Sequence, residues 1–250
     1  MGTVRWLLAA FVVLLAAAFL WRPLSAWWCD DQGNLALVRG DLAGAGTWFA
    51  RGLALEPSWH TLLEDRGRTV LDSDPAAALA DFREAACGEP CIAEAGDAEI
   101  RLGRVQDALD DYLAAHAVER VAGAVASLSQ SGRYDGAIAL ERALIVKLGS
   151  GMLAQADLAT AYDTIGSLDA LASQHRAQGR RAYEADAIRC YRRASDLAPF
   201  NEGYLLSLGF SELQWGSKSR ARAAFERVLD LHPHEADAER GLAQLGVVDR

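Results

Sequence analysis

One thirteen-residue pattern recurs along the chain and constrains its fold more than any other feature. The segment ARAAFERVLDLHP (221–233) places an alanine, an aromatic ring, a small apolar residue and a proline at fixed offsets. The same order recurs in AGTWFARGLALEP (45–57), ALADFREAACGEP (78–90) and AIRCYRRASDLAP (187–199). The first three positions fall at i, i+4 and i+7 on one face of a helix, and the proline ends that helix. The pattern predicts repeated helical hairpins with an aromatic ring between the two helices.

The composition favours a protein built almost wholly of helices. Apolar residues make up 51% of the chain and charged residues 24%, which provides ample material for a core. Only 6 prolines are present, and β-branched residues rarely cluster outside the N-terminal segment. Because strands favour β-branched residues, we expect an all-α fold.

On these residues the chain resembles the tetratricopeptide repeat (TPR) family, whose unit is a helix–turn–helix of about 34 residues. The copy at 202–235 carries the family's signature in the residues Leu208, Gly209, Ala221, Phe225, Val228 and Pro233. The resemblance covers roughly residues 26–246, and it implies an α-solenoid of stacked hairpins. Gly33 and Gly209 are expected to allow close packing of two helices.

The repeats are regular at both ends and degenerate in the centre. Leu140 and Tyr191 are 51 residues apart, so an extra or lengthened helix is expected at 153–166. A continuous superhelix is the first expectation, and two lobes with a break near 145–170 are the alternative. The expected parts are a tail (1–5), a membrane anchor (6–25), N-terminal repeats (26–122), degenerate middle repeats (123–167), C-terminal repeats (168–235) and a capping helix with a tail (236–250).

The N-terminal segment favours a membrane anchor. Sixteen uncharged residues, 6–21, stand between Arg5 and Arg22. A helix of this length spans about 24 Å, close to the roughly 30 Å hydrocarbon core. A cleaved signal peptide and a buried helix are the alternatives. Flanking charges and the high use of Ala, Arg and Gly predict a single-pass protein of a bacterial inner membrane with its solenoid in the periplasm.

The cysteines offer one candidate pair. Cys87 and Cys91 bracket the turn GEP, where a helix is expected to end at Gly88. The turn brings the pair into range of a disulfide, or the two residues are small apolar side chains at a helix junction. No motif for zinc, haem or thioredoxin-like chemistry is present, and we expect no metal and no cofactor.

Charge is distributed unevenly. Residues 30–111 carry 17 acidic and 7 basic side chains, a net charge of −10, whereas residues 112–250 carry a net charge of −1. The exception is a run of arginines that is either a dock for an acidic partner or lipid headgroups, or a solvated helix face. This candidate basic dock consists of Arg176, Arg180, Arg181, Arg189, Arg192 and Arg193. Neither the overall charge nor any motif favours nucleic-acid binding.

The sequence carries no motif of a known catalytic site, so we do not expect an enzyme. A glycan-processing enzyme that uses Asp110 and Asp111 is the weakest of three hypotheses. The TPR resemblance implies instead a groove lined by the first helices of the hairpins, which binds an apolar or amphipathic segment of a partner. The groove positions are Gly203, Leu206, Phe210, Leu213 and Gln214, which otherwise pack on the capping helix.

The sequence therefore predicts a protein whose partners are other proteins. The first hypothesis is a membrane-anchored TPR scaffold or assembly protein that serves an envelope or membrane complex. The alternative is a constitutive accessory subunit of a large membrane complex. Retention at fixed stoichiometry during purification is expected of a subunit and not of a transient scaffold.

Overall fold

The computed structural model describes the backbone of residues 2–152 and 155–248, and the side chains of residues 20–148 and 155–246. This part of the chain contains thirteen α-helices and no strand, so the prediction of an all-α fold is confirmed. The chain divides into two compact units, unit 1 (Met1–Arg120) and unit 2 (Val121–Arg250).

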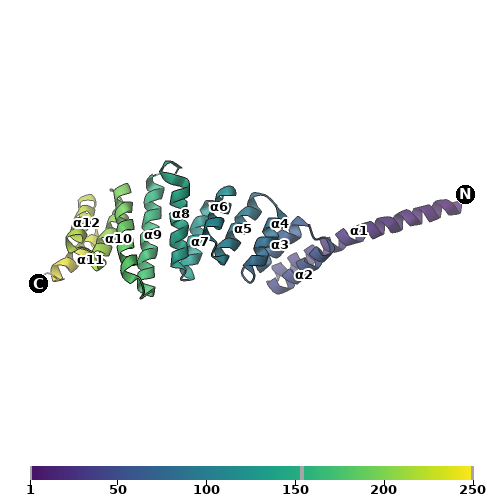
Figure 1. Ribbon diagram of the computed structural model, residues 1–250, viewed down its shortest axis with the longest axis horizontal. Helices are drawn as coiled ribbons and strands as arrows, with labels where there is room; N and C mark the ends of the chain where they lie inside the picture. Colours follow the sequence, from purple (N-terminus) through teal and green to yellow (C-terminus); the bar gives the residue numbers. More distant parts are fainter. Residues whose placement is uncertain (1, 153–154, 249–250) are drawn as a thin grey trace. The chain divides into compact units, whose positions relative to one another are not determined.

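Unit 1 consists of three helical hairpins. The first helix of each hairpin packs against the second, and each second helix contacts the first helix of the next hairpin (Figure 1). The helices are α1 (Gly2–Val38), α2 (Leu42–Leu55), α3 (His60–Val70), α4 (Pro75–Ala85), α5 (Glu89–Leu102) and α6 (Val105–Ala114).

Unit 2 is also built of antiparallel helix pairs, and three of its helices, α8, α9 and α10, are long, with 19, 21 and 18 residues. α9 packs between α8 and α10, and α11 contacts both α12 and α13 (Figure 1). The helices are α7 (Glu119–Gln130), which begins at the end of unit 1, α8 (Tyr134–Met152), α9 (Gln155–His175), α10 (Arg180–Leu197), α11 (Glu202–Trp215), α12 (Lys218–Leu231) and α13 (Ala236–Val248).

Five hairpins close on the same contact, a glycine of the first helix against an aromatic ring of the second. A Cβ atom at any of these glycines would lie 2.3–2.8 Å from the nearest ring carbon, so no larger residue fits without a shift. All five rings are buried. The pairs are Gly33–Phe49, Gly67–Phe82, Gly96–Tyr112, Gly166–Tyr191 and Gly209–Phe225. The predicted helical hairpins and the roles of Gly33 and Gly209 are therefore seen directly in the packing.

Lengthened helices explain the irregular centre. α8, α9 and α10 contain 19, 21 and 18 residues, compared with 14 in α2, α11 and α12. The glycine that faces Tyr191 is Gly166, 25 residues earlier, whereas Gly209 precedes Phe225 by only 16. Residues 153–154 of the predicted additional helix lie outside the described residues.

Helix starts in unit 1 follow from local sequence. The Asp41 side chain accepts a hydrogen bond from the Gly44 amide, at 2.8 Å, and Asp74 accepts one from the Ala77 amide at 3.0 Å. These carboxylates satisfy amides that have no partner within their own helix. Pro75 then occupies the first turn of α4, where its missing N–H has no cost.

The predicted membrane anchor requires a correction. Most of the predicted anchor, residues 6–19 of 6–25, has side chains that lie outside the described part of the structure. Among the described residues, no helix combines the length and the apolar character needed to cross a bilayer. The described part of α1 buries Ala26, Cys29 and Ala36 in the interior of unit 1. The predicted single-pass location in a bacterial inner membrane, with a periplasmic solenoid, is therefore wrong.

Candidate functional site

Carboxylates of three first helices gather on one face of unit 1. This acidic face consists of Asp30 of α1, Glu64 and Asp65 of α3, and Glu94 and Asp97 of α5. Each carboxylate lies close in sequence to the glycine of its own helix that faces an aromatic ring. Asp30 and Glu64 lie three residues before this glycine, Asp65 and Glu94 lie two residues before it, and Asp97 lies one residue after it. With 3.6 residues per turn, these offsets share one flank of a helix and leave the glycine free to face the ring. The repeat itself therefore aligns the carboxylates.

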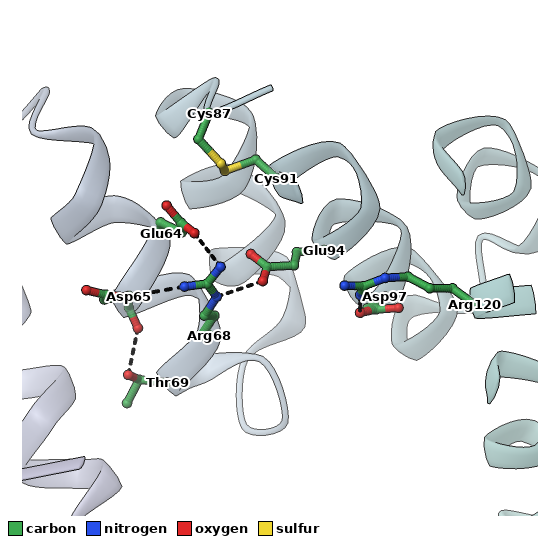
Figure 2. Close-up of polar contacts among 9 residues, drawn as sticks. All are labelled: Glu64, Asp65, Arg68, Thr69, Cys87, Cys91, Glu94, Asp97 and Arg120. Atoms are coloured by element: carbon green, nitrogen blue, oxygen red, sulfur yellow. Dashed lines mark hydrogen bonds and ion pairs between the residues drawn. A yellow bond between two sulfur atoms is a disulfide. The ribbon is translucent and has the colours of Figure 1, made fainter. Parts of the chain in front are cut away.

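Arg68 lies at the centre of the acidic face (Figure 2). Its Nε donates to Glu94 Oε1 at 2.6 Å, and its Nη1 lies 3.5 Å from Asp65 Oδ1. Its Nη2 contacts Glu64 Oε1. The guanidinium group thus joins α3 to α5 and partly neutralises three carboxylates at once.

The rest of the face is also only partly neutralised. Asp97 accepts a hydrogen bond from the Tyr112 hydroxyl at 2.8 Å and forms an ion pair with Arg120. Asp30 Oδ1 and Glu94 Oε2 are buried, and neither accepts a hydrogen bond from the described part of the chain. Arg68 and Arg120 thus contact four of the five carboxylates, and Asp30 Oδ1 and Glu94 Oε2 accept no hydrogen bond from the described residues.

Burial and mutual repulsion change the acidity of this face. The pKa of Asp65 lies above its ordinary value, because burial disfavours the charged form and because Asp30 lies nearby; Arg68 opposes this in part. The pKa of Asp30 is also raised, first by burial and then by Asp31. Burial and neighbouring carboxylates thus make Asp30 and Asp65 harder to ionise than exposed aspartates.

A disulfide joins Cys87 and Cys91 beside the acidic face (Figure 2). The Cα atoms are 5.4 Å apart, and Cys91 is buried at the start of α5. The chain turns between α4 and α5 through two residues with positive φ, Ala86 at 48° and Gly88 at 82°. Glycine adopts this conformation readily, which fits its place in the turn.

The candidate basic dock is largely engaged within unit 2. Four of its arginines contact acceptors of the chain. The contacts are Arg176 to Asp135 at 2.6 Å, Arg180 to the Ser173 carbonyl at 3.0 Å, Arg189 to Asp186, and Arg192 to Glu212 at 2.6 Å. Arg181 and Arg193 are exposed, and Arg181 lines a cleft of about 430 Å³ with Trp215 and Arg220.

The candidate groove on α11 is partly occupied by the chain itself. Leu206, Phe210 and Leu213 are half-buried and pack with the core cluster that α11, α12 and α13 share. The Phe210 ring lies 5.0 Å from the ring of Phe225, and the Arg240 guanidinium group of α13 lies 5.9 Å from Phe210. Gly203 and Gln214 are exposed. The three apolar side chains thus support the final hairpin and its capping helix.

The two aspartates of the enzyme hypothesis lie in different surroundings. Asp111 is buried and accepts a hydrogen bond from Arg83 at 2.6 Å. Asp110 is exposed. Two carboxylates that act on one substrate must face the same site, and the side chains of Asp110 and Asp111 on α6 do not.

No family model and no curated protein matches the chain. Among solved structures, a MamA protein is similar at 18% identity over 85% of this chain and 94% of that chain, with a TM-score of 0.34. The P58(IPK) TPR domain is similar at 15% identity over 92% and 67%, with a TM-score of 0.40. A tetratricopeptide repeat protein from Parabacteroides merdae ATCC 43184 is similar at 15% identity over 89% and 99%, also with a TM-score of 0.40.

The similar structures thus include TPR proteins. These TM-scores are below 0.5, and the helix pairs with their five glycine–ring contacts are the features that define the fold.

Proposed function

We propose that the chain is a protein-interaction module, and that unit 1 binds a positively charged segment of a partner through its acidic face. The observation that carries this proposal is the set of five aligned carboxylates, four of which contact Arg68 or Arg120. Lysine or arginine side chains of a partner pair with the carboxylates of this face, whose side chains stay 14–27% exposed at Glu64, Asp65, Glu94 and Asp97.

Partly buried carboxylates suit this role better than fully exposed ones. The side chains of Asp65 and Glu94 are 15% and 14% exposed, so they lie in a lower dielectric than bulk water. Their positions are fixed by Arg68 and by the helices, so little conformational entropy is lost on binding. The net negative face also attracts a cationic segment over about one Debye length, roughly 8 Å at physiological salt.

Peptide binding tests the proposal. We expect a fluorescent Lys/Arg-rich peptide to bind the full chain, and its Gln-substituted counterpart to bind far more weakly. Asp30→Asn combined with Glu94→Gln is expected to weaken binding about tenfold, with an affinity that depends less on salt. The matched control is Glu84→Gln with Asp107→Asn, which neutralises two exposed carboxylates on the second helices α4 and α6.

Circular dichroism establishes that the four substitutions leave the helices intact. Equal binding by the acidic-face variant and the wild type would contradict the assignment of the site. Equal weakening by the control variant would show that net charge alone, and not this face, attracts the peptide.

Two roles fit such a module, a scaffold that holds partners transiently and a constitutive subunit of a larger complex. Quantified co-purification of the tagged chain distinguishes them. One set of proteins at fixed stoichiometry indicates a subunit. A varied set at substoichiometric amounts indicates a scaffold.

A further inference from the structure

Two sulfur atoms and a carboxylate meet where the second hairpin of unit 1 joins the third. Glu64 comes from α3, Cys87 from the turn after α4, and Cys91 from the first turn of α5. One ligand atom from each residue lies within 4.8 Å of the other two. Figure 2 shows the Glu64 carboxylate close to the disulfide. Three separate segments thus place metal-ligating atoms in one small volume.

We propose that the reduced form of Cys87 and Cys91, together with Glu64, binds one zinc-class divalent cation. Zinc takes cysteine thiolates and carboxylate oxygens in tetrahedral sites, and the spacing C-x₃-C lies within the range seen for its paired cysteines. Three protein ligands leave a fourth position for water or for a ligand from a partner. This inference does not depend on the proposed binding of a basic segment.

The two forms of the site are related by a balanced exchange. A dithiol reductant supplies two electrons and two protons, which cleave the Cys87–Cys91 bond and form two thiols, while the reductant becomes a disulfide. Binding of the cation to the sulfurs then releases the two thiol protons to solvent. The oxidised protein holds no thiolates and cannot bind the cation in this way.

Two local features stabilise an anionic set of ligands beside the acidic face. Cys91 is the third residue of α5, where the helix terminus stabilises negative charge. Two thiolates and one carboxylate around a divalent cation leave one excess negative charge, and the Arg68 guanidinium group, which also contacts Asp65 and Glu94, lies against Glu64 and offsets part of it. Arg68 contacts Glu64 Oε1, which leaves Oε2 for the metal.

The site is accessible and yet partly desolvated. Cys91 is 2% exposed, whereas Cys87 and Glu64 are half-buried. In the oxidised protein, a disulfide joins the turn after α4 to α5. In the reduced protein, the bound cation joins these two segments and also α3, through Glu64. The same joint is thus held in either redox state, by different chemistry.

Cobalt serves as the spectroscopic probe. The full chain is reduced with a dithiol, freed of reductant without oxygen, and titrated with Co²⁺. We expect sulfur-to-cobalt charge-transfer absorption that saturates at one Co²⁺ per chain and is displaced by Zn²⁺, and none in the oxidised protein. Cys87→Ser and Cys91→Ser are each expected to abolish the absorption. Glu64→Gln should weaken Zn²⁺ binding about tenfold or more, measured by competition with a chelating indicator.

The matched control is Cys29→Ser with Cys190→Ser, which removes the two free cysteines and keeps the proposed ligands. It should retain the full cobalt signal. Absence of the signal in reduced wild type, or its loss in the control, would overturn the proposal. Unchanged Zn²⁺ affinity in Glu64→Gln would remove Glu64 from the site. Cys87→Ser replaces a half-buried residue, so its loss of signal remains interpretable if Cys91→Ser fails to fold.

Discussion

Single glycines decide how closely the helices of a hairpin approach. A Cβ atom at Gly96 would lie 2.7 Å from Tyr112 Cε1 and 3.2 Å from the Ala108 carbonyl oxygen. Gly96→Ala is therefore expected to lower the free energy of unfolding by about 1–3 kcal/mol, as overpacking does. Denaturant unfolding measures the change.

The control for this substitution lies in α7. A Cβ atom at Gly123 would meet no atom within 4 Å, so Gly123→Ala adds helix propensity without a clash. We expect it to stabilise the protein by up to about 1 kcal/mol. A Gly96→Ala variant as stable as the wild type would show that the ring of Tyr112 can move aside.

Asp169 makes the stability of unit 2 depend on pH. Its side chain is 2% exposed, its Oδ2 accepts no hydrogen bond among the described residues, and Arg142 Nη2 lies 3.8 Å away. Burial is the main cause that raises the pKa of Asp169 to about 7; Asp186 and Asp135 add to it, and Arg142 and Arg189 oppose it. Between pH 4 and pH 7 the folded protein binds more protons at this site than the unfolded chain does. The free energy of unfolding therefore falls as pH rises through this range.

Asp169→Asn removes this titration. As pH rises from 5 to 8, the wild type is expected to lose about 2 kcal/mol of the free energy of unfolding through Asp169, and the variant is expected to keep it. Denaturant unfolding at several pH values measures the difference. The exposed Asp157 of α9 provides the control, and Asp157→Asn should follow the wild-type profile. Parallel profiles for Asp169→Asn and wild type would contradict the assignment.

At the scale of the element, Phe225 connects the last three helices. The ring is fully buried on α12, and Cβ atoms at Gly209 of α11 and Gly241 of α13 would both meet it within 2.6 Å. Phe225→Ala should cost about 3–5 kcal/mol, because it leaves a cavity between three elements. Thermal or denaturant unfolding checks this, with the exposed Glu226→Ala as control, expected within about 0.5 kcal/mol of wild type.

The sequence predicted the hairpins well because one side-chain contact defines them. The rings of Phe49, Tyr191 and Phe225 and the glycines at 33 and 209 were readable from spacing alone. Gly166 was missed, since a fixed 34-residue period places the glycine too close to Tyr191. The greater lengths of α8, α9 and α10 depend on tertiary packing, which the spacing of residues in the sequence does not predict.

The acidic face was only half predictable. The excess of carboxylates in residues 30–111 is plain from composition, but composition does not say which of them share a face. Counting offsets from each glycine would have grouped Asp30, Asp65 and Glu94. Arg68 could not have been identified as the shared partner of Asp65 and Glu94, because its contact with Glu94 crosses from α3 to α5.

At the scale of the whole molecule, the two units are expected to unfold in distinguishable steps. Six of the seven tryptophans lie before residue 121, and only Trp215 lies after it, so tryptophan fluorescence reports mainly on unit 1. Reduction of the Cys87–Cys91 disulfide should lower the stability of unit 1 by about 2 kcal/mol, the value expected for a very short closed loop.

Fluorescence and circular dichroism should therefore separate on reduction. We expect the fluorescence transition to move to lower denaturant, while the part of the circular dichroism transition due to unit 2 stays in place. The Cys29→Ser, Cys190→Ser variant should respond to reduction in the same way. Coincident shifts of both signals would show that the units unfold together.

The repeated glycine–ring contact also bears on how such a chain can change over generations. Each ring lies against a glycine of its own hairpin, so duplication or deletion of a whole hairpin leaves the other rings with their glycines. A gene encoding this protein can therefore lengthen or shorten by one hairpin at a time and keep the contact that closes each remaining hairpin. The last hairpin is the exception, because Phe225 also lies against Gly241 of α13 and would need that helix to move with it.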